Sequence, residues 1–127
     1  MKYEEVSKYS NRQFQKATSL RRVTFKKMVE ILRKGYAEKH RRRGRAPKLS
    51  IEDLLLATLE YLLTDITYAQ LAANHGIAES NIYRGIQWVM DTLNQDGTFP
   101  LGRTERIYSI DMTYEVILVD ATGKSIY

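Results

Sequence analysis

Residues 67–93, TYAQLAANHGIAESNIYRGIQWVMDTL, have the pattern of two short helices joined by a tight turn. In the first helix, side chains for one face recur three and four residues apart, at Tyr68, Leu71 and Ala72. Gly76 begins the turn, where glycine allows the positive φ that ends many helices. The second helix repeats apolar residues at the spacing of a single face: Ile82, Ile86, Val89 and Leu93. This order predicts a helix-turn-helix, whose second helix can enter the major groove of DNA.

The second helix also carries a polar face. Ser80, Arg84 and Gln87 repeat along it at helical spacing. Arginine can donate two hydrogen bonds to a guanine edge, and glutamine can pair with adenine. Glu79 could accept from a cytosine amine or simply suit the helix N-terminus, and Tyr83 could reach a phosphate or a thymine methyl. The candidate DNA-contacting residues are therefore Glu79, Ser80, Tyr83, Arg84 and Gln87.

A plain αα-hairpin inside a helical bundle would show the same apolar spacing. The charge of the motif counts toward this alternative, because residues 67–94 hold Arg84 as their one arginine or lysine, against Glu79 and Asp91. The motif is not basic by itself. Affinity for DNA would have to come from another part of the chain.

Composition restricts the class of protein. A chain of 127 residues suits one ordinary domain, and 43% hydrophobic with 28% charged residues is typical of a soluble globular protein. No apolar run approaches the roughly 18–20 residues of a membrane helix, and the N-terminus has no signal-peptide core. The chain has no cysteine for disulfides or thiolate metal sites and two distant histidines, so no cofactor is expected for it. We expect a cytoplasmic protein.

The charge is distributed very unevenly along the chain. Residues 8–48 hold fifteen lysines or arginines against two glutamates, a net charge of +13. Residues 49–127 hold four against eleven acidic residues, a net charge of −7. A strongly basic N-terminal segment most simply indicates a surface that binds nucleic acid. Basicity alone does not exclude a membrane surface or an acidic protein as the partner, but we expect DNA and no membrane.

Residues 41–47, RRRGRAP, have the composition of an extended linker, because Gly44 and Pro47 oppose a continuous helix. Arg-Gly-Arg near a proline is also similar to arms that place arginines in a narrow minor groove, although here Ala46 delays the proline by one residue. A merely solvated linker is the alternative. The candidate residues for contacting the DNA backbone or minor groove are Arg41, Arg42, Arg43, Arg45 and Lys48.

Several further helices follow from caps and periodicity. Ser10 and Gln13 form a capping box for a short helix, and Arg22–His40 carries an apolar stripe, with Gly35 marking a bend or an end. Ser50 caps a helix over 50–63 that should be the most buried of all. This helix makes a three-helix unit with the helices at 68–75 and 80–94. His75 ends the second of them, where a protonated imidazole would suit the negative end of the helix dipole.

The periodicity changes after a loop at 94–100. Residues 106–110 and 114–119 are short and rich in Ile, Val and Tyr, which predicts two strands. The predicted fold is therefore mainly α, a helical bundle with a helix-turn-helix followed by a short C-terminal β stub. Its expected parts are 1–48, basic helices and linker; 49–95, the helix-turn-helix domain; and 96–127, the start of another domain.

The ordered set of motifs resembles a known family. The helix around 25–32, then RRRGRAPKLSIEDLLLATLEYL (41–62), YAQLAANHGIAESNIYRGIQWV (68–89) and VILVDAT (116–122) together resemble bacterial insertion-sequence transposases of the DDE superfamily. More narrowly, they are similar to the subgroup with a helix-turn-helix ahead of an RNase H-like nuclease. The resemblance implies binding of double-stranded DNA at terminal inverted repeats, in a bacterial cytoplasm and associated with the nucleoid.

The resemblance also implies a catalytic role for Asp120, which matches the first of three carboxylates that hold two Mg²⁺ ions in a complete family member. Two-metal chemistry needs several converging carboxylates, so Asp120 alone would neither bind the metal nor cleave DNA. After Asp120-Ala121-Thr122 the expected acidic residue and proline are replaced by Gly123 and Lys124.

We therefore expect a truncated transposase that binds DNA but is catalytically incomplete. One alternative is half of an active transposase, completed by the product of a downstream reading frame. Another is a helix-turn-helix transcriptional regulator. An unpaired strand edge in the stub would also invite self-association.

Overall fold

The computed structural model describes residues 1–40 and 49–99, apart from the side chains of residues 39 and 40. Six helices make up this part of the chain, and it contains no strand. They are α1 (Tyr3–Val6), α2 (Asn11–Thr18), α3 (Arg22–His40), α4 (Ile51–Leu63), α5 (Tyr68–His75) and α6 (Glu79–Asp96). The helical part of the predicted fold is confirmed. The strands expected at 106–110 and 114–119 lie outside the described residues.

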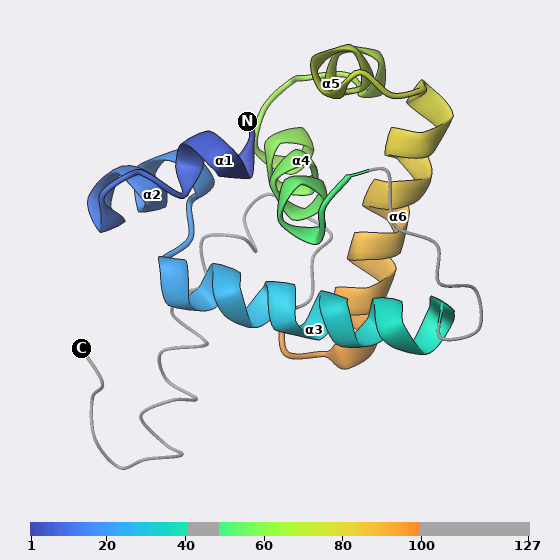
Figure 1. The fold of residues 1–127 in the computed structure, drawn as a ribbon, viewed down its shortest axis with the longest axis horizontal. Coiled ribbons are helices and arrows are strands. Elements are labelled where there is room, and N and C mark those ends of the chain that lie inside the picture. Colours follow the sequence, from blue (N-terminus) through green and yellow to red (C-terminus); the bar gives the residue numbers. More distant parts are fainter. Residues whose placement is uncertain (41–48, 100–127) are drawn as a thin grey trace.

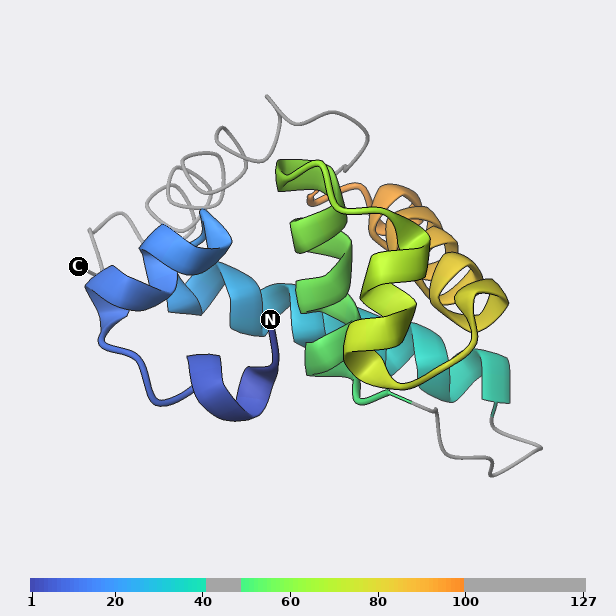
Figure 2. The ribbon, with the colours of Figure 1, turned by 90° about the horizontal axis from the view of Figure 1, so that it is seen from above.

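The helices form two groups, which are joined by α3 and by direct contacts of α1 and α2 with α4. Figure 1 shows α3 running along the bottom, α4 above its middle, and α6 crossing toward α5 at the top. Turned by 90°, the molecule has α1 and α2 on one side and α4, α5 and α6 on the other (Figure 2). The two ends of α6 therefore have different neighbours: its N-terminal end lies near α5 and its C-terminal end near α3.

Side-chain caps fix where three of the helices begin, because they satisfy backbone N–H groups that have no partner within the helix. Ser10 and Gln13 make the predicted capping box at α2, with each side chain bonded to the other residue's backbone N–H. The Ser50 hydroxyl accepts from the backbone N–H of Asp53, 3.1 Å away, as predicted. Thr67 does the same for Gln70 at the start of α5, also at 3.1 Å.

The core consists of two adjoining clusters of buried side chains. The larger one joins α1–α4 to the C-terminal half of α6 and includes most of the predicted α3 stripe: Phe25, Met28, Val29 and Leu32. The smaller one holds the helix-turn-helix against α4 and consists of Ala57, Leu71, Ala72, Ile82 and Ile86. Seven of the thirteen α4 residues are buried, a larger share than in any other described helix, so α4 is the most buried of them, as predicted.

The first two helices are tied to the rest of the fold by polar contacts as well as by the core. The backbone N–H of Tyr3 donates to a carboxylate oxygen of Asp53 at 2.7 Å, which connects α1 to α4. Arg22 donates to the Asn11 side chain and to the backbone carbonyls of Ser7 and Tyr9, and its guanidinium lies over the Phe14 ring. This arginine of the basic segment therefore has a structural role.

Two glycines inside helices permit close packing around α6. A Cβ on Gly35 of α3 would lie 2.8 Å from the Thr92 methyl, and one on Gly85 of α6 would lie 2.6 Å from a Leu54 methyl. These separations are well below ordinary contact distances, so the absent side chains bring α3 and α4 close to α6. The helix α3 does not end at Gly35, as the sequence had allowed, but continues to His40.

His75 ends α5, but the structure does not favour the protonated form that the sequence suggested. Its Nε2 atom is buried without a hydrogen-bond partner. Burial lowers the pKa of His75 from 6.5, the Met1 amino group and Lys2 act in the same direction, and Asp53 and Glu60 oppose them. The neutral imidazole is therefore the form that fits this site at neutral pH.

This pKa shift predicts a pH-dependent stability. The unfolded chain takes up a proton on His75 near pH 6.5, while the folded chain resists it until a lower pH, so His75 destabilises the fold as pH falls below 6.5. The urea midpoint of the protein should therefore fall more between pH 7 and 5 than that of His75→Gln. His40→Gln, which leaves His75 in place, is the control. Equal pH dependence of the protein and His75→Gln would contradict the prediction.

Candidate nucleic-acid interface

The helices α5 and α6 are joined by a turn with the geometry of a helix-turn-helix. Gly76 has φ of 65° and ψ of 33°, the left-handed conformation predicted for it. The backbone N–H groups of Gly76 and Ile77 return to the carbonyls of Ala73 and Ala72, at 3.3 and 3.1 Å, and close the end of α5. Ala72 is buried at the contact with α6, where a larger side chain would hold the helices apart.

The helix α6 has two distinct faces. Ile82, Ile86, Val89 and Leu93 are all fully buried, as their spacing predicted. Glu79, Ser80, Tyr83 and Arg84 are exposed, and Gln87 is half-buried. The structure thus brings the five candidate residues of α6 together near its N-terminal end. That they contact DNA remains a prediction.

The helix is longer than the sequence indicated. It begins at Glu79, one residue before the predicted start, after an N-cap residue, Ala78, that makes no side-chain cap. It ends at Asp96 rather than Asn94, because Gly97 supplies the left-handed conformation that stops it, with φ of 82°. Phe99 then closes the larger core cluster, so this end of α6 is anchored and not a free loop.

Three tyrosines, one from each helix of the three-helix unit, meet beside this polar face. The rings of Tyr61 (α4) and Tyr68 (α5) are stacked with centroids 4.3 Å apart. The ring of Tyr83 (α6) meets Tyr68 edge-on at 5.2 Å. Burial and the adjacent Tyr61 hydroxyl raise the pKa of Tyr68 to about 12, while the Gln87 side chain, which also hydrogen-bonds Tyr68, opposes this shift.

Sequence reasoning identified Tyr83 but not its partners. Tyr61 and Tyr68 were assigned no site role, although they flank the short connection between α4 and α5. The sequence feature that could have indicated the cluster is the presence of three tyrosines within 23 residues, near helix ends. The structure also gives Gln87 a protein neighbour in Tyr68, which limits how this amide can orient.

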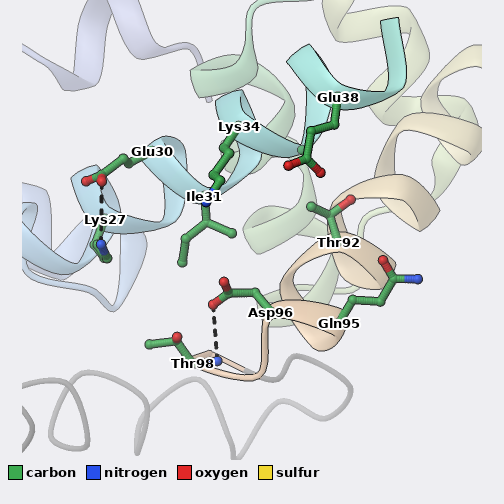
Figure 3. A pocket seen from close by; sticks show the side chains of 10 residues that line it. Lys27, Glu30, Ile31, Lys34, Glu38, Thr92, Gln95, Asp96 and Thr98 are labelled. Carbon is green, nitrogen blue, oxygen red and sulfur yellow. Dashed lines mark hydrogen bonds and ion pairs between the residues drawn. The ribbon is translucent and has the colours of Figure 1, made fainter.

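A hollow lies on another part of the molecule, between α3 and the end of α6. Its volume is about 460 Å³, and Figure 3 shows Lys27, Glu30, Lys34, Glu38 and Asp96 around it. The Lys27 ammonium pairs with Glu30 at 3.5 Å, and Asp96 accepts from the backbone N–H of Thr98 at 3.3 Å. With charges of both signs in close alternation, this hollow has no clear preference for an anion or a cation.

The described residues do not fit the metal centre implied by the resemblance. Within residues 1–40 and 49–99, no cluster of three histidine or acidic side chains could hold a metal ion. Asp120 lies outside the described residues, as do the candidate backbone-contacting residues Arg41, Arg42, Arg43, Arg45 and Lys48. Nor, in the described part, is any helix long and apolar enough to cross a membrane.

Comparison with known proteins agrees with this geometry. Residues 47–99, from just before α4 to just after α6, match the family described as "Helix-turn-helix of DDE superfamily endonuclease". The chain is also similar to a protein of Microchaete diplosiphon described as "Probable transposase for insertion sequence element IS702". The chain is a distant homologue of that transposase. The predicted resemblance to insertion-sequence transposases of the DDE superfamily is confirmed.

The similarity to the IS702 protein extends over almost the whole chain. The two sequences are 27% identical over 126 residues, which is 99% of this chain and 45% of the relative. The chain thus spans less than half the length of the transposase it matches. No solved structure matches it significantly.

The turn of the helix-turn-helix yields a stability prediction. Gly76→Ala should lower the free energy of unfolding by about 1 kcal/mol, because alanine is strained at positive φ. No atom lies within 4 Å of the added Cβ, so a steric clash contributes nothing. Gly76→Asn is the matched variant and should cost less, because asparagine tolerates this conformation. Urea unfolding measures both, and an alanine variant as stable as the protein would contradict the assigned backbone conformation.

Proposed function

We propose that this chain binds double-stranded DNA, with α6 in the major groove, at the terminal inverted repeats of an insertion sequence. The observation that supports it most is the division of α6 into a fully buried apolar face and an exposed polar face. The N-terminal half of α6 presents Ser80, Arg84 and Gln87 on the polar face. An arginine and an amide at this position have the donors and acceptors that base edges recognise.

The basic segment 8–48 supplies affinity that does not depend on sequence. The described part of it has exposed cations on α2 and α3, among them Arg12, Lys16, Lys26 and Lys34. Two of its arginines already have protein partners. Arg22 donates to a backbone carbonyl between α1 and α2, and Arg33 forms an ion pair with Glu52. Lysine and arginine bound to phosphates displace counterions, so this contribution should weaken steeply with salt.

The place of α3 supports a role for the arginines that follow it. Gly35 packs on Thr92 of α6, and the Tyr36 ring meets Trp88 edge-on at 6.0 Å. Thr92 lies eight residues after Arg84, which is about 12 Å along the helix axis. The chain therefore enters residues 41–48 from a helix packed beside the recognition helix. Arg41, Arg42, Arg43, Arg45 and Lys48 are the residues we propose for the adjoining DNA backbone or minor groove.

Strand cleavage would need groups beyond the described residues. As the resemblance implies, Asp120 would be one ligand of a Mg²⁺ pair, which would stabilise the attacking and leaving oxygens. Within the described residues, no group of three histidine or acidic side chains could hold a metal ion by itself. The function that we propose for the described residues is recognition of the element's ends.

The proposal predicts selective binding to the sequence that borders the gene. Fluorescence anisotropy would compare a labelled duplex of that sequence with a scrambled duplex over a salt series. We expect tighter binding to the border duplex, with the preference surviving moderate salt because base contacts carry it. Equal binding to both duplexes, lost as salt rises, would leave only a basic protein without a working recognition helix.

Two arginine variants should separate base reading from phosphate binding. Arg84→Ala should lower discrimination between the two duplexes by about 1–3 kcal/mol. Arg43→Ala should weaken binding to both duplexes alike and reduce the salt slope by about 1. If Arg84→Ala weakens both duplexes equally, the assignment of α6 as the recognition helix is wrong.

A further inference from the structure

We propose that Tyr61, Tyr68 and Tyr83 form a neutral surface that contacts the sugar–phosphate backbone of DNA next to the groove that α6 enters. The inference rests on the proposed DNA binding and adds to it the residues and the chemistry of one contact. The three residues are called the tyrosine cluster below.

The tyrosine cluster is aromatic surface shared between three helices. Tyr61 lies in the last turn of α4, Tyr68 is the first residue of α5, and Tyr83 lies in the second turn of α6. Their rings touch in sequence, at 4.3 and 5.2 Å between centroids. Tyr83 is 48% exposed, although large hydrophobic side chains in the described part of the chain are mostly buried. Tyrosine at such a position presents an apolar ring and a hydroxyl to a partner.

The cluster adjoins the proposed reading residues. Tyr83 follows Ser80 by three positions and precedes Gln87 by four, so the three share one face of α6. Tyr68 touches Tyr83 from the first helix of the motif, and in helix-turn-helix complexes that helix crosses the DNA backbone. When α6 lies in the groove, Tyr68 and Tyr61 are thus on the side where a phosphate strand is expected.

The charge of the sequence around the cluster favours a neutral side chain as the hydrogen-bond donor to phosphate. Residues 61–96 hold Arg84 as their one lysine or arginine, against Asp65, Glu79, Asp91 and Asp96. Arg84 is thus the one cation that this stretch of sequence offers to a phosphate, and tyrosine is one of the neutral side chains that commonly contact phosphates. Because the pKa of Tyr68 is raised to about 12, its hydroxyl keeps its proton at every pH at which such binding would be measured.

A contact between a neutral side chain and a phosphate can be distinguished by how the affinity depends on salt. A tyrosine hydroxyl that donates to a phosphate adds affinity for any sequence, but it displaces no counterion. Removing it should therefore weaken binding without changing the slope of affinity against salt. Loss of an arginine or lysine contact to phosphate would instead flatten that slope.

The test uses the full chain, the labelled border duplex and the scrambled duplex in a salt series. The triple variant Tyr61→Phe, Tyr68→Phe, Tyr83→Phe keeps the rings and their packing but removes the three hydroxyls. We expect both duplexes to bind about tenfold more weakly, with an unchanged salt slope. The ratio between the two duplexes is read from Tyr83→Phe, which leaves the contact between Tyr68 and Gln87 in place and should not change it. The matched control is Tyr9→Phe, an exposed tyrosine of the N-terminal part, which should bind like the unaltered protein.

Thermal unfolding shows whether the triple variant keeps its fold. If its melting temperature falls, the single variant Tyr83→Phe decides, since this hydroxyl is at an exposed ring, and about threefold weaker binding is expected. Wild-type affinity of a folded variant for both duplexes would overturn the inference, as would a loss confined to the border duplex, which would mean base reading. If the unaltered protein binds neither duplex, the proposed function fails, and this inference fails with it.

Discussion

The polar face of α6 depends on the apolar face behind it. Ile82, Ile86, Val89 and Leu93 are fully buried against the other helices. Each such side chain contributes roughly 1.5–3 kcal/mol when it leaves water, whereas the net stability of a whole domain is only about 5–15 kcal/mol. Loss of even one of them would therefore remove a substantial part of the net stability of the fold. Without this stripe the exposed residues of α6 would have no fixed relation to one another.

Close packing then fixes α6 at both ends. Near its start it meets α4 at Gly85, and near its end it meets α3 at Gly35. Tight contacts of this kind tolerate little sliding, because protein interiors are packed as densely as organic crystals. The polar face of α6, the tyrosine cluster and the end of α3 are consequently parts of one rigid arrangement. The binding surface of the proposed interface needs no rearrangement of the described helices to form.

Much of the helical fold was predictable, because local chemistry marks helix ends. The helices α3 and α5 have the predicted bounds, and Ser10 and Ser50 cap as expected. The end of α6 was misplaced by two residues, since Gly97 and not the preceding polar residues stops the helix. The state of His75 was also misjudged, because burial by another part of the chain is not visible in its own helix.

The candidate site was only partly predictable, for a related reason. Helical periodicity places Ser80, Arg84 and Gln87 on one face, and that face is where the structure has them. The tyrosine cluster could not be foreseen, because the ring contacts of Tyr68 depend on the angles between three helices. The close approach of α3 to α6 at Gly35 likewise depends on which helix packs against α3. The low helix propensity of glycine indicates only that α3 is locally less stable there.

The two faces of α6 have a consequence for how such a protein diversifies. Because stability resides in the buried stripe, substitutions at the exposed positions Glu79, Ser80 and Arg84 should leave folding nearly unaffected. Under the proposed function, new target preferences can then arise by changes at a few surface codons, with no compensating changes in the core. A combinatorial library over these positions would start from a fold that tolerates substitution there. The separation of the buried stripe from the exposed positions would likewise let related mobile elements acquire distinct ends while they keep one common architecture.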